Sequence, residues 1–256
     1  MRSFRDEISK STKRKKSNIV LALDLVEVNR NRLISKTMEI LEETAPHICA
    51  VKLNRQLVLP LGLYGGADKI VNRIHDLGLP VIMDCKINDV GHTNVMIATH
   101  YFDAGFDAVT ASPFVGWEDG LQPVFKVAQE RGKGVILLVY MSHRGANEGY
   151  GQMVYISKGN RLSPQYEVFA MKAKLWKADG AIVGATYPEK IKAVHKILKK
   201  EVPIYSPGVG SQGGDIKAAI SAGATYLIIG RSIINAESPA ETAKELKEIA
   251  WNFVST

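Results

Sequence analysis

Short apolar runs alternate with longer amphipathic stretches from residue 18 to the end of the chain. The runs are nearly continuous in apolar residues, which is typical of parallel strands that helices cover. We expect eight strands, at Ile19–Leu25, Ile48–Leu53, Pro80–Ile87, Ala108–Ser112, Val135–Met141, Ala181–Ala185, Pro203–Ser206 and Tyr226–Gly230. Helical spacing of apolar residues predicts helices between them, such as Arg32–Thr44, Ala67–Leu77, Asn94–Ala104, Tyr166–Ala178 and Ala240–Phe253.

Eight strand–helix units in about 240 residues predict an α/β fold, a single-domain (β/α)8 TIM barrel over residues 18–256. An open, doubly wound parallel sheet is the alternative. No linker rich in Pro or Ser divides the chain. The longest irregular stretch is expected at 142–164, which is rich in Gly, Asn and Ser, and a loop of that length is usually functional or mobile.

Charge is concentrated at the N-terminus. The chain is 46% hydrophobic and 23% charged, as globular proteins are, and its net charge is +7. Residues 1–16 hold seven Lys or Arg and two Asp or Glu, which leaves only +2 for the rest. We interpret residues 1–17 as a basic, solvated and poorly ordered arm, with a contact to an acidic partner such as RNA as the alternative. Specific nucleic-acid binding is not expected of the domain itself.

The lengths of the apolar runs and the positions of the cysteines exclude a membrane-spanning protein and a disulfide-rich one. No apolar run approaches the length of about 18 residues that a membrane span needs. The run Ile19–Leu23 is also too short for a signal peptide. Cys49 and Cys85 lie far apart without metal-ligand spacing, so we expect a cytoplasmic protein with neither a disulfide framework nor a metal site.

Charged residues interrupt the third apolar run, which reads VIMDCKI. Side chains alternate between the two faces of a strand, so Asp84 and Lys86 share one face. Met83, Cys85 and Ile87 share the other, which is expected to contact the helices. Asp84 and Lys86 then point into the barrel at the carboxyl end of the strand, where active sites form in this fold.

Neighbouring strands carry charges at the same end. Asp24 ends the first apolar run, Lys52 lies in the second, and Asp89 follows Asp84 and Lys86 beyond the third. A network of salt bridges at the rim is one interpretation, because buried charges persist when they are paired. Five converging charges favour catalysis instead. A lysine held between carboxylates stays an ammonium ion and can stabilise and protonate a carbanion, without a redox cofactor or a metal.

A glycine-rich stretch after the seventh expected strand, SPGVGSQGGD, indicates an anion site. Its GxGxxG spacing does not mark a dinucleotide site, because it lies outside the first strand–helix unit and no acidic residue follows at the required distance. Loops after strands seven and eight bind phosphate in barrels. Gln212 and Arg231 can donate hydrogen bonds there. The alternative is that the stretch is only a glycine-rich turn beside a surface arginine. We favour a phosphate site, which predicts that the substrate is a small phosphate monoester.

Together these motifs resemble the orotidine 5'-phosphate decarboxylase family. Asp84-x-Lys86-x-x-Asp89 matches the DxKxxD motif, which 3-keto-L-gulonate 6-phosphate decarboxylase and hexulose-6-phosphate synthase share. A longer pattern is similar to orotidine 5'-phosphate decarboxylases themselves and runs in order from residue 21 to 232. It comprises Asp24 in LALD, Lys52 in VKLN, Thr93, Ser142 in YMSHRGA, Gln212 in PGVGSQGGD and Arg231 in IIGRS.

The resemblance implies cofactor-free decarboxylation of orotidine 5'-monophosphate to UMP, a step of pyrimidine nucleotide synthesis. Lys86 would protonate C6 as CO2 leaves, and Asp84 would lie against the substrate carboxylate. Lys52 would hold Asp84 and contact the ribose, and Asp24 would bind a ribose hydroxyl. Asp89 would complete the catalytic set from a neighbouring protomer.

The resemblance also implies a homodimer, because Asp89 and Thr93 reach the partner's site in this family. Ser142 would recognise the pyrimidine. The remaining substrate-binding residues would be Pro207, Val209, Gln212, Gly230 and Arg231. One position departs from the pattern: Gly91 stands where many members have proline. Glycine at that position also occurs in the sugar-phosphate relatives, so a Mg²⁺-dependent enzyme such as hexulose-6-phosphate synthase remains the alternative.

Overall fold

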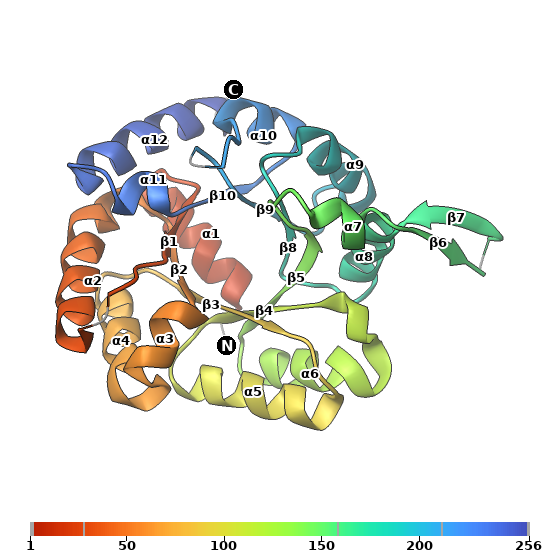
Figure 1. Cartoon of the computed structure of the whole chain (residues 1–256), viewed down its shortest axis with the longest axis horizontal. Helices are drawn as coiled ribbons and strands as arrows, with labels where there is room; N and C mark the ends of the chain where they lie inside the picture. Colours follow the sequence, from red (N-terminus) through yellow and green to blue (C-terminus); the bar gives the residue numbers. More distant parts are fainter. Residues whose placement is uncertain (1–2, 28, 158, 211, 255–256) are drawn as a thin grey trace.

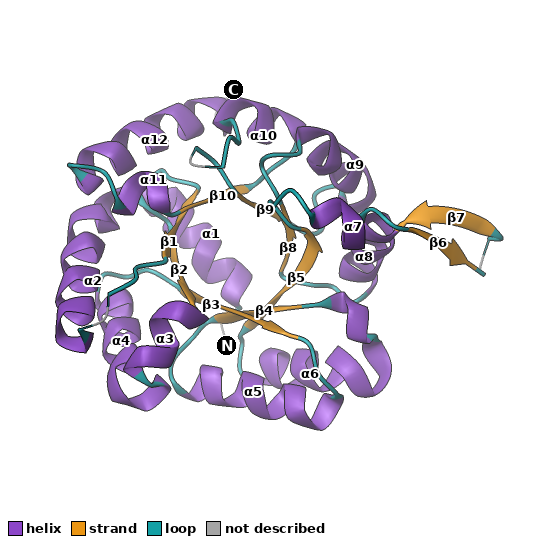
Figure 2. Ribbon diagram, in the orientation of Figure 1, coloured by secondary structure: helices purple, strands orange, loops and turns teal. Residues whose placement is uncertain are grey.

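Eight parallel strands close into a barrel in the computed structural model, which describes residues 3–27, 29–157, 159–210 and 212–254. Figures 1 and 2 show the barrel from one end, inside a ring of helices. Its strands are β1 (Ile19–Leu23), β2 (Ala50–Asn54), β3 (Val81–Ile87), β4 (Ala108–Ala111), β5 (Gly134–Tyr140), β8 (Gly180–Val183), β9 (Ile204–Pro207) and β10 (Tyr226–Ile229). The hydrogen-bonded order β1-β10-β9-β8-β5-β4-β3-β2 is closed, so the predicted TIM barrel is confirmed and the open sheet is excluded.

Each barrel strand is followed by a helix that covers it. These helices are α2 (Arg30–Thr44), α4 (Asp68–Asp76), α5 (Gly91–Asp103), α6 (Gln122–Glu130), α8 (Gln165–Leu175), α9 (Pro188–Leu198), α10 (Ile216–Ala222) and α12 (Pro239–Val254). Shorter helical segments lie in the connections, namely η1 (Ala45–His47), α3 (Arg55–Leu61), η2 (Leu63–Ala67), η3 (Pro113–Val115), η4 (Trp117–Leu121) and α11 (Arg231–Ile234). None of the helices in the described ranges combines the length and apolar character needed to cross a bilayer.

Two apolar layers hold the barrel together, one on each face of the sheet. The outer layer packs the strands against the helices and includes Met83, Cys85 and Ile87, as the alternation along β3 predicted. The inner layer fills the barrel with inward-facing side chains such as Ile82 and Ile136. This division is the usual one for such barrels, in which the interior is a packed core and not a pore.

The N-terminal segment corrects one expectation. Residues 1–17 were expected to form a solvated, poorly ordered arm, but α1 (Phe4–Lys15) is a helix that packs on the barrel. Phe4 and Ile8 are buried among the inner apolar side chains. Gly134, at the start of β5, leaves room for the Phe4 ring, because a Cβ there would overlap it. The helix therefore closes the amino-terminal end of the barrel; residues 1–2 lie outside the described chain.

Hydrogen bonds at the start of α1 cap the helix and tie it to the rest of the chain. Ser3 caps its first turn, where the Ser3 hydroxyl accepts from the backbone N–H of Asp6. Nη2 of Arg5 donates to the carbonyl oxygen of Glu201 at 2.7 Å. The basic residues of this segment thus lie on a folded element, and part of their role is structural.

The stretch 142–164 also differs from the irregular loop that was expected. It contains α7 (Ala146–Tyr150) and an antiparallel hairpin of β6 (Met153–Ile156) and β7 (Arg161–Pro164). Gly159 and Asn160, in the connection, have positive φ angles of 104° and 46°, which suits a tight hairpin turn. Figure 1 shows this hairpin projecting away from the barrel.

The packing of α5 accounts for Gly91. A Cβ at this position would lie 2.8 Å from the carbonyl oxygen of Asp119 and 3.3 Å from Cγ of Pro123. The start of α5 therefore approaches the backbone of η4 so closely that only glycine fits. The close packing of α5 against η4 therefore explains the glycine at position 91. The charged residues of the motif, Asp84, Lys86 and Asp89, do not depend on it.

Candidate active site

A row of alternating charges lies at the carboxyl ends of the first three strands. Nζ of Lys52 in β2 lies 2.9 Å from Oδ2 of Asp84 in β3, and 3.7 Å from Oδ1 of Asp24 just beyond β1. Nζ of Lys86 lies 2.8 Å from the other carboxylate oxygen of Asp84. The four side chains thus form the continuous sequence Asp24–Lys52–Asp84–Lys86, as the strand ends predicted.

Charge coupling fixes the protonation of the two inner groups. Burial alone would raise the pKa of Asp84, but the ammonium groups of Lys52 and Lys86 lower it well below its usual range. Burial alone would lower the pKa of Lys52, but Asp84 and Asp24 raise it above the ordinary value. At neutral pH, Asp84 is therefore a carboxylate and Lys52 is an ammonium ion.

A bulge in β3 directs Lys86. The register between β3 and β4 shifts between Met83 and Ile87, and Lys86 has a φ of 51°, in the left-handed region. Such bulges often redirect side chains next to active sites. The backbone N–H of Lys86 donates to the Thr110 hydroxyl at 2.9 Å, and that hydroxyl donates to Oδ1 of Asp84 at 2.9 Å.

Thr110 is a member of the site that the sequence did not reveal. It lies in β4, is fully buried, and connects the bulge at Lys86 to the Asp84 carboxylate. The only available signal was one hydroxyl in the apolar run AVTA, which is common in strands. The hydroxyl becomes informative only once the bulge has brought Lys86 beside it.

The charged row borders a cavity of about 230 Å³ at the carboxyl end of the barrel. All of the predicted site residues except Asp89 and Thr93 line it, namely Asp24, Lys52, Asp84, Lys86, Ser142, Pro207, Val209, Gln212, Gly230 and Arg231. The rest of the wall was not predicted and is mostly apolar: Ala22, Asn54, Leu138, Met141, Gly208, Ile182 and Ile228. The cavity thus has a charged side, an apolar side and, around Gln212 and Arg231, a set of potential anion donors.

Asp89 and Thr93 do not reach this cavity from their own chain. Asp89 is exposed beyond β3, where its Oδ1 accepts from the N–H of Val90 at 2.7 Å. Its own N–H donates to the side chain of Asn94 at 2.9 Å. Thr93 lies half-buried in the first turn of α5. Within one chain the DxKxxD motif is therefore divided, with Asp84 and Lys86 in the cavity and Asp89 outside it.

The glycine-rich loop after β9 folds back on itself. The N–H groups of Gly210, Gly213 and Gly214 donate to carbonyl oxygens within the loop, at 2.7–3.0 Å. These three donors are therefore occupied and are not free to bind an anion. Gln212, Gly230 and Arg231 remain as the lining residues suited to that task.

Gly208 allows two predicted residues to approach each other. A Cβ at Gly208 would lie 2.9 Å from Oε1 of Gln212 and 2.9 Å from Cβ of Ser142. Its φ of 95° is also one that glycine adopts without strain. The loops after β5 and β9 consequently meet at the cavity, although they are far apart in the sequence.

In the ranges that the structure describes, no group of three or more His, Cys, Asp or Glu side chains is placed to hold a metal ion.

Comparisons with known proteins show the family of the chain. A family model described as orotidine 5'-phosphate decarboxylase / HUMPS family matches residues 17–246. Orotidine 5'-phosphate decarboxylase of Pyrococcus abyssi is 36% identical over 229 residues, which cover 89% of this chain and 96% of that protein. The Thermococcus kodakarensis protein of the same name is 37% identical over 233 residues, covering 91% and 96%.

Solved structures give the same result. Orotidine 5'-monophosphate decarboxylase of Methanocaldococcus jannaschii, complexed with inhibitor BMP, superposes with a TM-score of 0.76 at 30% identity. The match covers 91% of this chain and 98% of that one. The family model, the sequence relatives and the shared fold lead to one conclusion: the chain belongs to the orotidine 5'-phosphate decarboxylase / HUMPS family.

Proposed function

We propose that this protein decarboxylates orotidine 5'-monophosphate to UMP in pyrimidine nucleotide synthesis, without a cofactor. The observation that carries the proposal is the row Asp24–Lys52–Asp84–Lys86 beside a cavity that Gln212 and Arg231 also line. The named relatives are orotidine 5'-phosphate decarboxylases, and the M. jannaschii neighbour was solved with an inhibitor bound. A nucleotide monophosphate whose base reaches Lys86 and whose phosphate reaches Arg231 would use both the charged row and the anion donors of the cavity.

Lys86 is the proposed proton donor. The C6–CO2⁻ bond breaks, its electron pair stays on C6, and the Lys86 ammonium supplies the proton that completes UMP. Of the Asp84, Lys52 and Lys86 side chains in the network, that of Lys86 is the most exposed, at 24% against 13% for Asp84 and 7% for Lys52. It can therefore face the substrate while Asp84 holds its amine in place.

Asp84 is proposed to destabilise the bound substrate. Its carboxylate stays ionised next to the position proposed for the C6 carboxylate, so the two negative charges repel until CO2 leaves. Enzymes lower reaction barriers by about 8–23 kcal/mol, and one lysine contact does not supply that amount. Phosphate binding by Gln212, Gly230 and Arg231 would offset the repulsion, because binding energy from a remote group can be used at the reacting carbon.

Asp24 and Lys52 are proposed to bind the ribose. Oδ1 of Asp24 is buried but has no hydrogen-bond partner in the described chain, since Lys52 is 3.7 Å away. Buried acceptors are nearly always satisfied in native structures, so a ligand hydroxyl is a suitable partner for this oxygen. Ser142 is proposed to contact the pyrimidine, with Pro207 and Val209 completing the substrate-binding wall.

A homodimer with shared sites is proposed for Asp89 and Thr93, which lie outside the cavity of their own chain. Large apolar side chains are exposed on the elements beside them: Leu59 on α3, Tyr64 on η2, and Val90 and Met96 at the start of α5. Each exposes more than half of its surface, which supports an interface on this face. A second chain docked here would bring its Asp89 toward the first chain's Lys86.

The buried, unpaired cysteines Cys49 and Cys85 suit a reducing compartment, and we propose a cytoplasmic location.

The direct test is to follow the absorbance of orotidine 5'-monophosphate with the purified protein in EDTA. The proposal predicts full turnover without added metal or cofactor. Two results together would contradict the proposal: loss of orotidine 5'-monophosphate turnover in EDTA, and Mg²⁺-dependent activity on ribulose 5-phosphate. They would instead indicate a hexulose-6-phosphate synthase.

A further inference from the structure

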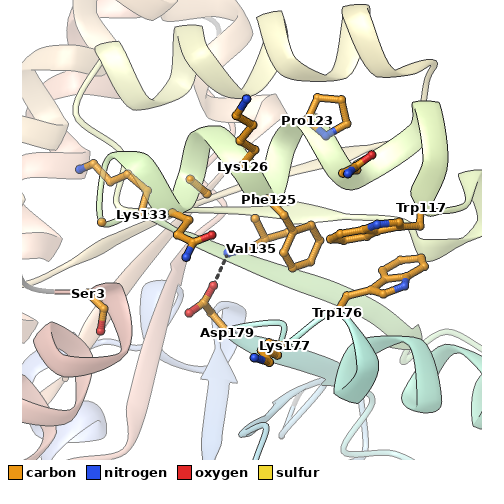
Figure 3. A pocket seen from close by; sticks show the side chains of 14 residues that line it. Ser3, Trp117, Pro123, Phe125, Lys126, Lys133, Val135, Trp176, Lys177 and Asp179 are labelled. Atoms are coloured by element: carbon orange, nitrogen blue, oxygen red, sulfur yellow. Dashed lines mark hydrogen bonds between the residues drawn. The ribbon is translucent and has the colours of Figure 1, made fainter.

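A second cavity lies outside the barrel, between α6, β5 and the end of α8 (Figure 3). Its volume is about 800 Å³, against about 230 Å³ for the catalytic cavity, and the two have no lining residue in common. Small-molecule sites typically occupy about 300–1,000 Å³. We call it the α6/α8 cavity; the proposed decarboxylation gives it no role.

One end of the α6/α8 cavity is aromatic. Trp117 of η4 and Trp176 after α8 have ring centroids 5.2 Å apart at an angle of 33°. Phe125 of α6 lies 5.2 Å from Trp117 and 6.3 Å from Trp176. All three side chains are partly exposed, and Figure 3 shows them together at one side of the cavity. They present aromatic surface to any molecule that enters.

Lysines lie around the rest of the cavity, on different sides of it. Lys126, Lys133 and Lys177 line it, and Asp179 is the single carboxylate among the lining residues. Lys133 pairs with Asp107 at 2.8 Å, whereas Lys126 and Lys177 form no ion pair within the described ranges. The Asp179 carboxylate accepts from the N–H of Val135 at 2.9 Å. The lining therefore carries an excess of positive charge without partners.

The aromatic wall and the lysines together select a class of ligand. A cation is disfavoured, because the lysines repel it and the ammonium of Lys172 already lies 5.5 Å from the Trp176 ring centroid. An uncharged apolar molecule would leave the free ammonium groups unused. A planar ring joined to an anionic group uses both, since aromatic side chains stack on any nucleobase and lysines bind phosphate.

We propose that the α6/α8 cavity binds a nucleotide, with the base on the Trp117–Phe125–Trp176 wall and the phosphate toward the lysines of the lining, of which Lys126 and Lys177 form no ion pair in the described chain. The site is separate from the catalytic cavity, so it can be occupied while the barrel mouth is free. It extends the recognition of nucleotides to a second place on the molecule.

AMP is a suitable probe, because it combines a purine base with one phosphate. Trp117 and Trp176 are two of the three tryptophans in the chain, so saturable quenching of intrinsic fluorescence reports on the cavity. Removal of a stacking side chain weakens base binding by roughly five- to one-hundred-and-fifty-fold, which is the loss expected for Trp176→Ala. The double variant Lys126→Glu/Lys177→Glu should weaken AMP binding by about tenfold or more, with an unchanged melting temperature.

Two controls separate this site from the rest of the molecule. Lys192→Glu/Lys196→Glu, on the exposed face of α9, changes charge equally and should leave AMP affinity unchanged. Arg231→Ala removes the phosphate donor of the catalytic cavity and should also leave it unchanged. The proposal is overturned if AMP shows no saturable binding in the millimolar range. It is equally overturned if Arg231→Ala abolishes binding while the Lys126→Glu/Lys177→Glu variant retains it.

Discussion

Asp84 has an ammonium group on each side, and this arrangement explains how a buried carboxylate remains ionised. Its oxygens lie 2.9 Å from Nζ of Lys52 and 2.8 Å from Nζ of Lys86, and a third bond comes from the Thr110 hydroxyl. Breaking one part of such a buried network leaves another charge without a partner, which is costly. The same contacts that stabilise the fold therefore orient the proposed proton donor.

The network predicts how stability depends on pH. The pKa of Asp84 is lowered in the folded protein, so its ionised form contributes stability above the unfolded value of about 3.9, and that contribution is lost as the pH falls toward the folded value. The raised pKa of Lys52 acts in the opposite range: its contribution is present below about 10.4 and is lost only at higher pH. Between about pH 5 and 3, the free energy of unfolding should fall by on the order of 1 kcal/mol more in wild type than in Asp84→Asn.

Urea unfolding at a series of pH values measures this difference. Asp119→Asn is the matched control, because Asp119 is exposed and forms no ion pair in the described chain. Its acid dependence should follow that of wild type. Equal acid slopes for wild type and Asp84→Asn would show that Asp84 is not ionised in the way described.

Thr110 offers a second prediction at this scale. Thr110→Val keeps the shape of the side chain but leaves the buried N–H of Lys86 without its acceptor. We expect a loss of about 1–3 kcal/mol in stability and of about tenfold in kcat, because the bulge and the Lys86 amine lose their support. Thr110→Ser keeps the hydroxyl and should retain most of the activity. If the valine and serine variants were equally active, the hydroxyl would have no positioning role.

Single residues differ in how far the sequence reveals them. Asp24, Lys52 and Asp84 were predictable, because charges at the ends of apolar runs must meet when the strands are parallel. The bulge at Lys86 was not, since its positive φ depends on the pairing with β4 and leaves no mark in the sequence. The orphaned Oδ1 of Asp24 likewise becomes visible only once its surroundings are known.

At the scale of elements, α1 shows that a segment rich in basic residues can also carry an apolar face that packs on the protein. Its many basic residues indicated a solvated arm, whereas Phe4 and Ile8, spaced four apart, form the face that enters the barrel. Two apolar residues in a basic segment are weak evidence in a sequence. The barrel end that they fill exists only after the eight strands have closed.

The contribution of α1 to stability is testable by cavity creation. Phe4→Ala should lower the free energy of unfolding by about 3–5 kcal/mol, because the ring is fully buried. Lys13→Ala, on the exposed side of the same helix, should change it by less than about 0.5 kcal/mol. Chemical denaturation measures both. At a temperature where both variants are folded, their kcat should match that of wild type, because the catalytic cavity lies at the opposite end of the barrel. Equal free energies of unfolding for Phe4→Ala and Lys13→Ala would contradict the packing of α1 against the barrel.

At the scale of the whole molecule, the apolar residues that stabilise the fold and the charged residues of the proposed active site lie at opposite ends of the barrel. The amino-terminal end is closed by α1 and the inner apolar core, while charges gather at the carboxyl end. This architecture was predictable because eight apolar runs with intervening amphipathic stretches have few alternatives. The hairpin of β6 and β7 was not, because its two four-residue strands interrupt a stretch rich in Gly, Asn and Ser and, in the described chain, pair with each other alone.

Shared sites predict complementation between two inactive variants. Lys86→Ala and Asp89→Asn would each impair every site of their own homodimer. A mixed dimer would have one site with both changes and one with neither. Refolding equal amounts together should restore about a quarter of wild-type activity, if subunits of a symmetric dimer mix at random. Absence of any recovery, in mixtures shown to contain mixed dimers, would place Asp89 outside the partner's site.

The most direct measurement is kcat for orotidine 5'-monophosphate with Lys86→Ala, alongside the affinity of the same variant for UMP. The account predicts that kcat falls by at least about a hundredfold, since the proposed proton donor is lost, while UMP binding through Gln212 and Arg231 persists. An exposed lysine, Lys192→Ala, serves as the control and should retain wild-type kcat. A Lys86→Ala enzyme with near-normal kcat would contradict the proposed mechanism at its centre.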